Sequence, residues 1–134
     1  MTETFTFLRD QYNGPDYRVL DDAYSALGSM LVSDVQNDTL WCLRILGWVE
    51  DMRSGRPSND QWGGNSWSAE LAPDGLHLQD LYSDDWRGDY SLDEAHDVVL
   101  KYFDFLAPGT GEKERAIAAW EAEAGRVHPC RPHL

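Results

Sequence analysis

An acidic stretch with interleaved aromatic residues is the part of this chain whose residue types point most directly to chemistry. Residues 74–104 hold nine carboxylates against only two cationic side chains, and Tyr82, Trp86 and Tyr90 lie among them. Tyrosine and tryptophan supply the anchoring contacts of protein interfaces, and charge of one sign around them speeds encounter with a partner of the opposite sign. The stretch therefore predicts a surface that binds a basic protein. The residues expected to form that surface are Asp80, Tyr82, Asp84, Asp85, Trp86, Asp89 and Tyr90.

Two other interpretations of the acidic stretch are open. In one, Trp86 folds inward over a sheet and the aspartates only keep the loop solvated, as runs of charge commonly do. In the other, four of the aspartates supply oxygen ligands to Ca²⁺. The register of a helix-loop-helix calcium site, with its central glycine and closing glutamate, is absent from the sequence. We therefore expect no metal in this stretch.

Histidine and cysteine residues give weaker signals. His128, Cys130 and His133 are close enough in the sequence to share a metal. They stand in a proline-broken tail without a second cysteine pair, however, and we expect that tail to be disordered. His96 lies one helical turn from two leucines, which favours the edge of the core or solvent over a ligand role. His77 alternates with two leucines on a strand, so it should face a partner or water.

The order of the residues shows no active site. Hydrolysis needs a nucleophile beside a base, or two carboxylates held across a cleft. The chain has no Gly-x-Ser-x-Gly elbow, and nothing in its order pairs Cys42 or Cys130 with a particular histidine. We therefore expect a non-enzymatic protein with no catalytic residue, no metal and no cofactor.

Charge and composition narrow the class of partner. The net charge of −13 argues against nucleic acid and anionic lipid as direct ligands, because both are polyanions.

The 134 residues fit one domain, and six Trp, six Tyr and four Phe are too much apolar material for a disordered chain. No apolar run approaches the ~20 residues that span a bilayer, and the N-terminus has no basic segment followed by an apolar core. The cytoplasm is therefore the expected location.

The acidic stretch needs a hairpin and a helix to position it. Apolar residues fall at every second place in 67–71 and again in 76–78, which is the period of strands that are wet on one side. Ala72-Pro73-Asp74-Gly75 between them has the chemistry of a turn. Beyond this hairpin, Ser91 and Glu94 have the spacing of a capping box, and a helical period follows to Leu106.

The rest of the chain predicts further elements. Residues 4–8 alternate like a first strand, and 10–16 are turn residues. Residues 20–31 have helical spacing that Gly28 and Ser29 weaken, so a strand is the alternative there. Asn37 or Asp38 can cap a helix that Gly55 and Pro57 stop, and 56–65 is a polar loop.

These elements predict an α+β fold, a small antiparallel sheet with helices packed on one face, in a single domain. Its core should span residues 1–106. Residues 107–134 should add a short helix over 112–124 and an irregular tail.

Several short motifs also resemble a known family. They are Phe7-Leu8-Arg9-Asp10, Ala26-Leu27-Gly28 with Leu31 and Asp34-Val35, the amphipathic helix that follows, and Trp62, Asn65 and Trp67 before the hairpin. Over roughly residues 5 to 106 the chain resembles the YacL-type family of small acidic bacterial proteins, which has no assigned activity. The layout is also similar to immunity proteins of contact-dependent inhibition and other polymorphic toxin systems. The resemblance implies a cytoplasmic α+β protein of bacterial type that neutralises a toxin, and it adds no catalytic residue.

The function we expect from the sequence is that of an immunity protein, which occludes a basic toxin such as a nuclease. A nuclease presents a positive cleft to its substrate, and clustered aspartates can compete for that cleft. Two alternatives are open: a small-ligand-binding domain or enzyme with a pocket between sheet and helices, and an inhibitor that mimics the charge of DNA.

Overall fold

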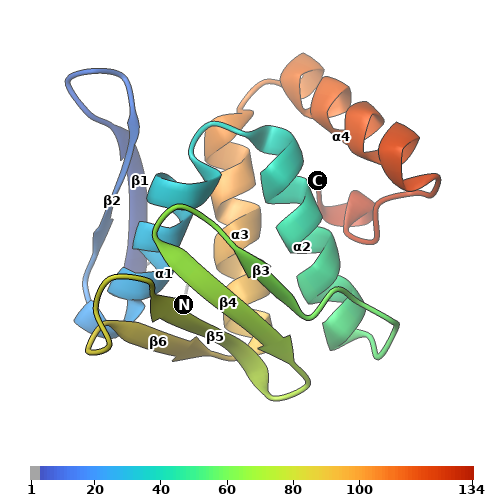
Figure 1. Ribbon diagram of the computed structural model, residues 1–134. Coiled ribbons are helices and arrows are strands. Elements are labelled where there is room, and N and C mark those ends of the chain that lie inside the picture. Colours follow the sequence, from blue (N-terminus) through green and yellow to red (C-terminus); the bar gives the residue numbers. More distant parts are fainter. Residues whose placement is uncertain (1–3) are drawn as a thin grey trace.

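Two antiparallel sheets and the helices that join them make up residues 4–134, the part of the chain that this computed structural model describes (Figure 1). The smaller sheet pairs β1 (Phe5–Arg9) with β2 (Pro15–Val19). The larger sheet has the strand order β3-β4-β5-β6, with β3 (Gln61–Gly63), β4 (Trp67–Ala72), β5 (Gly75–Asp80) and β6 (Arg87–Tyr90). The helices are α1 (Ser25–Met30), α2 (Thr39–Arg53), α3 (Leu92–Leu106) and α4 (Thr110–Ala124), with short turns η2 (Asp22–Tyr24), η3 (Leu31–Val35) and η4 (Arg131–His133).

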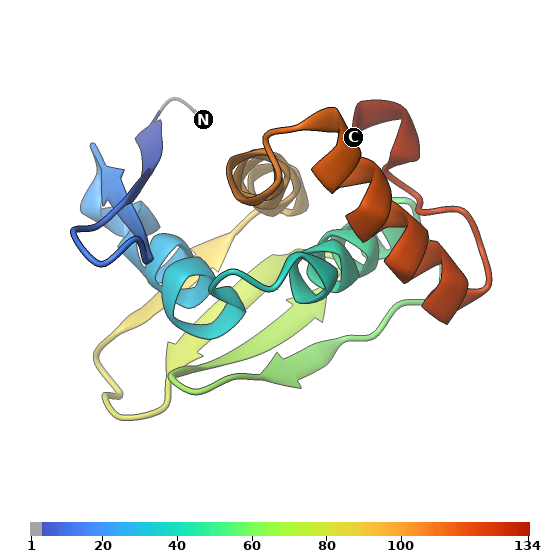
Figure 2. The same cartoon turned by 90° about the horizontal axis from the view of Figure 1, so that it is seen from above.

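The helices lie on one face of the larger sheet, and its other face is open (Figure 2). On β4, Trp67, Ala69 and Leu71 are buried beneath the helices. Successive side chains of a strand point to opposite faces, so Ser68 and Glu70 lie on the open face. The predicted α+β fold, with helices packed on one face of a small antiparallel sheet, is confirmed.

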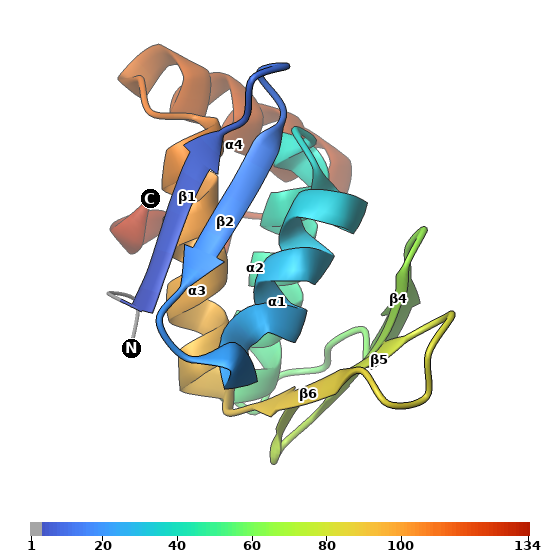
Figure 3. The same cartoon turned by 90° about the vertical axis from the view of Figure 1, so that its left-hand side faces the viewer.

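The predicted first strand belongs to a separate hairpin and not to the larger sheet. The hairpin of β1 and β2 lies against α1 and α3 (Figure 3). There the ring of Phe7 meets that of Tyr102 edge to face, with centroids 4.9 Å apart. β2 begins inside the segment predicted to be a turn, and its Tyr17 ring covers Gly28 of α1 so closely that a Cβ on that glycine would lie 2.4 Å from the ring. This close approach explains a glycine in the middle of a helix.

The two long central helices begin at the predicted caps. The carboxylate of Asp38 accepts the N–H of Trp41 at 3.0 Å at the start of α2, and Ser91 Oγ accepts the N–H of Glu94 at 3.0 Å at the start of α3. Of the predicted helix over residues 20–31, residues 22–31 are helical, but in short pieces: η2, α1 and the start of η3, which continues to Val35. Across residues 4–134, no helix combines the length and apolar character needed to cross a membrane.

The prediction of a disordered tail is wrong. After α4 the chain turns back, and the side chains of His128 and Cys130 are buried between elements of the core. His128 Nδ1 accepts the N–H of Cys130 at 3.0 Å, so its Nε2 carries the proton and donates to the carbonyl of Leu43 at 2.8 Å. Burial lowers the pKa of His128, which agrees with this neutral form. The tail is therefore fixed by α2.

The C-terminal region shares the core of the rest of the chain. Ala116, Ile117 and Trp120 of α4 are buried in the same cluster as the residues of α2 and α3. An ion pair of 2.6 Å between Arg126 and Asp51 holds the chain that leaves α4. Residues 107–134 therefore belong to the same folded domain as the rest of the chain and share its core. Of the predicted core range 1–106, the first three residues lie outside the described part.

Candidate functional site

The β5–β6 loop, residues 81–86, carries most of the predicted binding surface and is fixed to the sheet at both ends. At its base the N–H of Asp80 donates to the carbonyl of Trp86 at 2.9 Å. The N–H of Leu81 donates to the carbonyl of Ser66 at 2.8 Å. The carboxylate of Asp80 accepts the N–H of Tyr82 at 2.7 Å, which holds the first turn of the loop. The loop is therefore positioned by the hairpin below it.

Three large side chains of this loop face solvent. Leu81 is 49% exposed, Tyr82 83% and Trp86 41%. Three of the six exposed large hydrophobic side chains found in residues 4–134 thus lie within six consecutive residues. The ring of Trp86 rests edge-on against buried Trp67, with centroids 5.0 Å apart. The alternative in which Trp86 folds inward over the sheet is therefore partly correct. The ring packs against the core, but much of it stays accessible to solvent.

Carboxylates surround these exposed side chains. Asp84 and Asp85 are exposed at the tip of the loop. Below it, Asp34 of η3 accepts the backbone N–H groups of Ser66 and Trp67 at 2.9 and 3.0 Å. Burial raises the pKa of Asp34, the backbone hydrogen bonds oppose that rise, and the charge of Asp80 adds to it. The loop is therefore strongly acidic, and the backbone at Ser66 and Trp67 below it is held by hydrogen bonds to Asp34.

Tyr90 does not belong to the exposed surface, contrary to the prediction. It is buried, its hydroxyl donates to the carbonyl of Ala23 at 2.8 Å, and the same oxygen accepts the N–H of Leu27 at 3.2 Å. Burial raises the pKa of Tyr90 to about 12. The cause is the alternation of β6, in which Asp89 faces the open side and Tyr90 faces the helices.

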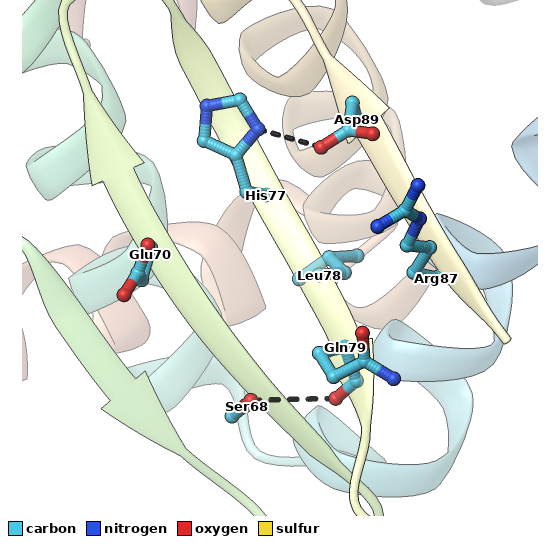
Figure 4. A pocket seen from close by; sticks show the side chains of 7 residues that line it. All are labelled: Ser68, Glu70, His77, Leu78, Gln79, Arg87 and Asp89. Carbon is cyan, nitrogen blue, oxygen red and sulfur yellow. Dashed lines mark hydrogen bonds and ion pairs between the residues drawn. The ribbon is translucent and has the colours of Figure 1, made fainter. Parts of the chain in front are cut away.

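The open face of the larger sheet holds a shallow polar pocket of about 290 Å³ (Figure 4). His77 of β5 lines this pocket and bridges two carboxylates. Its Nδ1 lies 2.7 Å from Asp89, and its Nε2 lies 2.9 Å from Asp74. The hydrogen bond to Asp74, and then that to Asp89, raises the pKa of His77. The polar residues that line the pocket are Ser68, Glu70, His77, Gln79, Arg87 and Asp89.

The pairing of His77 predicts a pH-dependent contribution to stability. Because its pKa is raised on folding, the contribution is present in full below the ordinary histidine pKa of ~6.5 and is lost as pH rises through the folded-state pKa. His77→Gln should therefore lower the free energy of unfolding at about pH 6 by less than about 1 kcal/mol, since both carboxylates are largely exposed. The difference should be smaller at about pH 9, because the charged part of the interaction is lost as the pH rises through the folded-state pKa of His77. Urea unfolding at the two values measures it, and an NMR titration of His77 that gives an ordinary or lowered pKa would refute the account.

A second group of side chains was not predicted as a group. Glu50 of α2, His96 of α3 and Cys130 of the tail place one ligand atom each within 4.8 Å of one another. His96 is buried at 5% exposure, deeper than the edge position expected for it. Of the tail residues considered for a shared metal, only Cys130 belongs to this group, because both nitrogens of His128 are used by the backbone and His133 is exposed.

No family model matches this chain, and comparisons with curated proteins and with solved structures found no match. A function can therefore be proposed only from the geometry of the described residues.

Proposed function

We propose that this protein binds a basic protein through the β5–β6 loop and so blocks that protein's active surface. The observation that supports this most strongly is the grouping of exposed Leu81, Tyr82 and Trp86 among exposed aspartates on one anchored loop. A solvated loop without a partner has no need of three large apolar side chains in solvent. We further propose that the partner is a toxin of bacterial origin, that the protein is its immunity protein, and that both meet in the cytoplasm.

The aromatic side chains are suited to anchor a partner. Tyrosine and tryptophan bury large areas with few rotatable bonds, so little entropy is lost when they are fixed. The backing of Trp86 by Trp67, and the hydrogen bond of 3.2 Å from the Tyr82 hydroxyl to the carbonyl of Asn65, hold both rings before any partner arrives. Such preorganisation lowers the cost of association.

The charge of the loop is suited to a basic cleft. Asp84 and Asp85 project from a chain whose net charge is −13. An enzyme that acts on nucleic acid needs positive potential at its active site, and an acidic loop competes for that same site. Steering by charge raises association rates above the ~10⁵ to 10⁶ M⁻¹s⁻¹ of neutral protein pairs and weakens as salt increases.

The experiment is a comparison of two triple variants in binding to a partner captured from the organism that encodes the protein. Trp86→Ala with Asp84→Asn and Asp85→Asn removes one anchor and two charges from the loop. We expect it to weaken binding by about 30-fold or more, the effect of losing a single hot spot of ~2 kcal/mol. Equilibrium titration by calorimetry at two salt concentrations measures the loss.

The matched control removes the same kinds of group elsewhere. Tyr12→Ala with Asp22→Asn and Asp60→Asn takes one exposed aromatic ring and two exposed carboxylates from outside the β5–β6 loop. It should leave affinity within about threefold of the parent, since substitutions outside an interface act only through the weak overall field. Equal losses in the two triple variants would reject the loop as the interface, and a captured partner without net positive charge would reject the mechanism.

A further inference from the structure

Three segments far apart in the sequence meet where the tail closes over the two central helices. Glu50 comes from the last turns of α2, His96 from the first turns of α3 and Cys130 from the residue before η4. His96 Nε2 lies 3.6 Å from Glu50 Oε2 and 3.6 Å from Cys130 Sγ. The atoms that converge are a carboxylate oxygen, an imidazole nitrogen and a thiol sulfur.

We propose that Glu50, His96 and Cys130 bind a Zn²⁺ ion that fastens the tail to α2 and α3. Ligand atoms held at about 2.0–2.3 Å by a tetrahedral Zn²⁺ lie roughly 3.3–3.6 Å from one another. The two separations of 3.6 Å that involve His96 fit that geometry, and all three atoms lie within 4.8 Å of one another. The third separation, between the ligand atoms of Glu50 and Cys130, is therefore no more than 4.8 Å.

The carboxylate of Glu50 has one cationic partner, and that partner is shared with a second carboxylate. Its Oε2 is buried and is paired with the guanidinium of Arg53, and its Oε1 accepts a hydrogen bond from Ser54 Oγ at 2.9 Å. The guanidinium of Arg53 forms an ion pair with Oε2 at 3.0 Å, but it also reaches Asp93 at 3.1 Å. Arg53 therefore keeps a partner when Glu50 turns to a metal. Because a buried carboxylate is costly unless its charge is compensated, a metal bond to Oε2 would add to the compensation that the shared Arg53 supplies.

The orientation of His96 supports the same site. Its Nδ1 lies 3.0 Å from the carboxylate of Asp97. When Nδ1–H donates to Asp97, the lone pair of Nε2 is left to face Glu50 and Cys130. Metal-bound histidines generally make such a bond to a carboxylate from their other nitrogen, which fixes the ring and strengthens the ligand.

The donor set selects the metal. Sulfur disfavours Mg²⁺ and Ca²⁺, which take oxygen ligands, whereas thiolate, imidazole and carboxylate together are typical of Zn²⁺. A thiolate and a carboxylate neutralise the ion, so the buried group carries no net charge. The imidazole of His133 lies perpendicular to that of His96, with centroids 6.3 Å apart.

The test uses untagged protein, kept reduced and stripped of metal by a chelator. Zn²⁺ alone, followed by calorimetry, should bind with a stoichiometry of one per chain and raise the melting temperature. Co²⁺ in its place should give the absorption of a tetrahedral ion with a sulfur ligand. Cys130→Ser, His96→Gln and Glu50→Gln should each weaken Zn²⁺ binding by more than about 100-fold, because even the partners of ligating histidines are worth 10–100-fold.

His77→Gln is the matched control, since His77 also lies between two carboxylates but at the open face of the sheet. It should leave the affinity for Zn²⁺ unchanged, while Asp97→Asn should lower it by about tenfold or more. Circular dichroism of each metal-free variant separates loss of a ligand from loss of the fold. Absence of saturable Zn²⁺ binding by the folded parent, or undiminished binding by folded Cys130→Ser, would overturn the proposal.

Discussion

Replacing Trp67 with alanine should lower the free energy of unfolding by about 3–5 kcal/mol, the range for removing a large aromatic side chain from a well-packed core. Trp67 is 1% exposed and lies at the start of β4. Its indole N–H donates to Ser29 Oγ at 3.2 Å. The substitution leaves a cavity and removes the partner of that buried hydroxyl, so both effects act in the same direction.

Trp86→Ala is the comparison for this prediction. Trp86 packs on Trp67 but is 41% exposed, so its removal should cost only about 1 kcal/mol. Urea unfolding followed by circular dichroism gives both values. A loss below about 1 kcal/mol for Trp67→Ala would mean that the sheet does not pack on the helices through this residue. A small loss for Trp86→Ala also makes that substitution safe to use in binding experiments.

Replacing Gly75 with alanine should cost about 3 kcal/mol or more, because strain and overlap add. Gly75 begins β5 with a φ of +148°, a conformation that residues with a Cβ rarely adopt. A Cβ there would lie 2.1 Å from the backbone carbonyl oxygen of Tyr90, on the neighbouring strand. A flexible side chain can move aside, but the backbone of a paired strand cannot move without breaking its ladder. Thermal unfolding should show the loss as a large drop in melting temperature.

Gly63→Ala is the matched control for Gly75→Ala. Gly63 is also a strand glycine, on β3, but a Cβ there would meet nothing within 4 Å. It should change the free energy of unfolding by no more than about 0.5 kcal/mol. If the two alanine variants unfold alike, the turn between β4 and β5 does not have the tight conformation described.

The sequence could predict those elements whose pattern is local and repeated. The helix of α3 shows a helical period over four turns with a capping serine, and β4 shows strict alternation. By contrast, β3 and β6 are three and four residues long, and each carries a single large apolar or aromatic side chain. They become strands only because β4 and β5 offer edges to pair with, and pairing is tertiary information.

The candidate site was predictable to the same extent. The acidic and aromatic stretch was visible in the sequence. The burial of Tyr90, however, follows from β6, a strand too short to be recognised from the sequence. Had β6 been identified, its alternation would have placed Asp89 outside and Tyr90 inside. The tail was mispredicted because its composition suggests disorder, whereas its order comes from the contact of His128 with Leu43, 85 residues earlier.

Photocrosslinking from the β5–β6 loop, in the living organism, can show whether this loop binds a basic protein. Two variants carry a photoreactive amino acid, one in place of Tyr82 and one in place of Tyr12, which are 83% and 84% exposed. Position 82 should give a crosslink to one basic protein, whose activity the parent protein blocks, and position 12 should give none. A crosslink to that protein from position 12 alone, or equal crosslinks from both positions, would contradict the assignment of this loop as the binding surface.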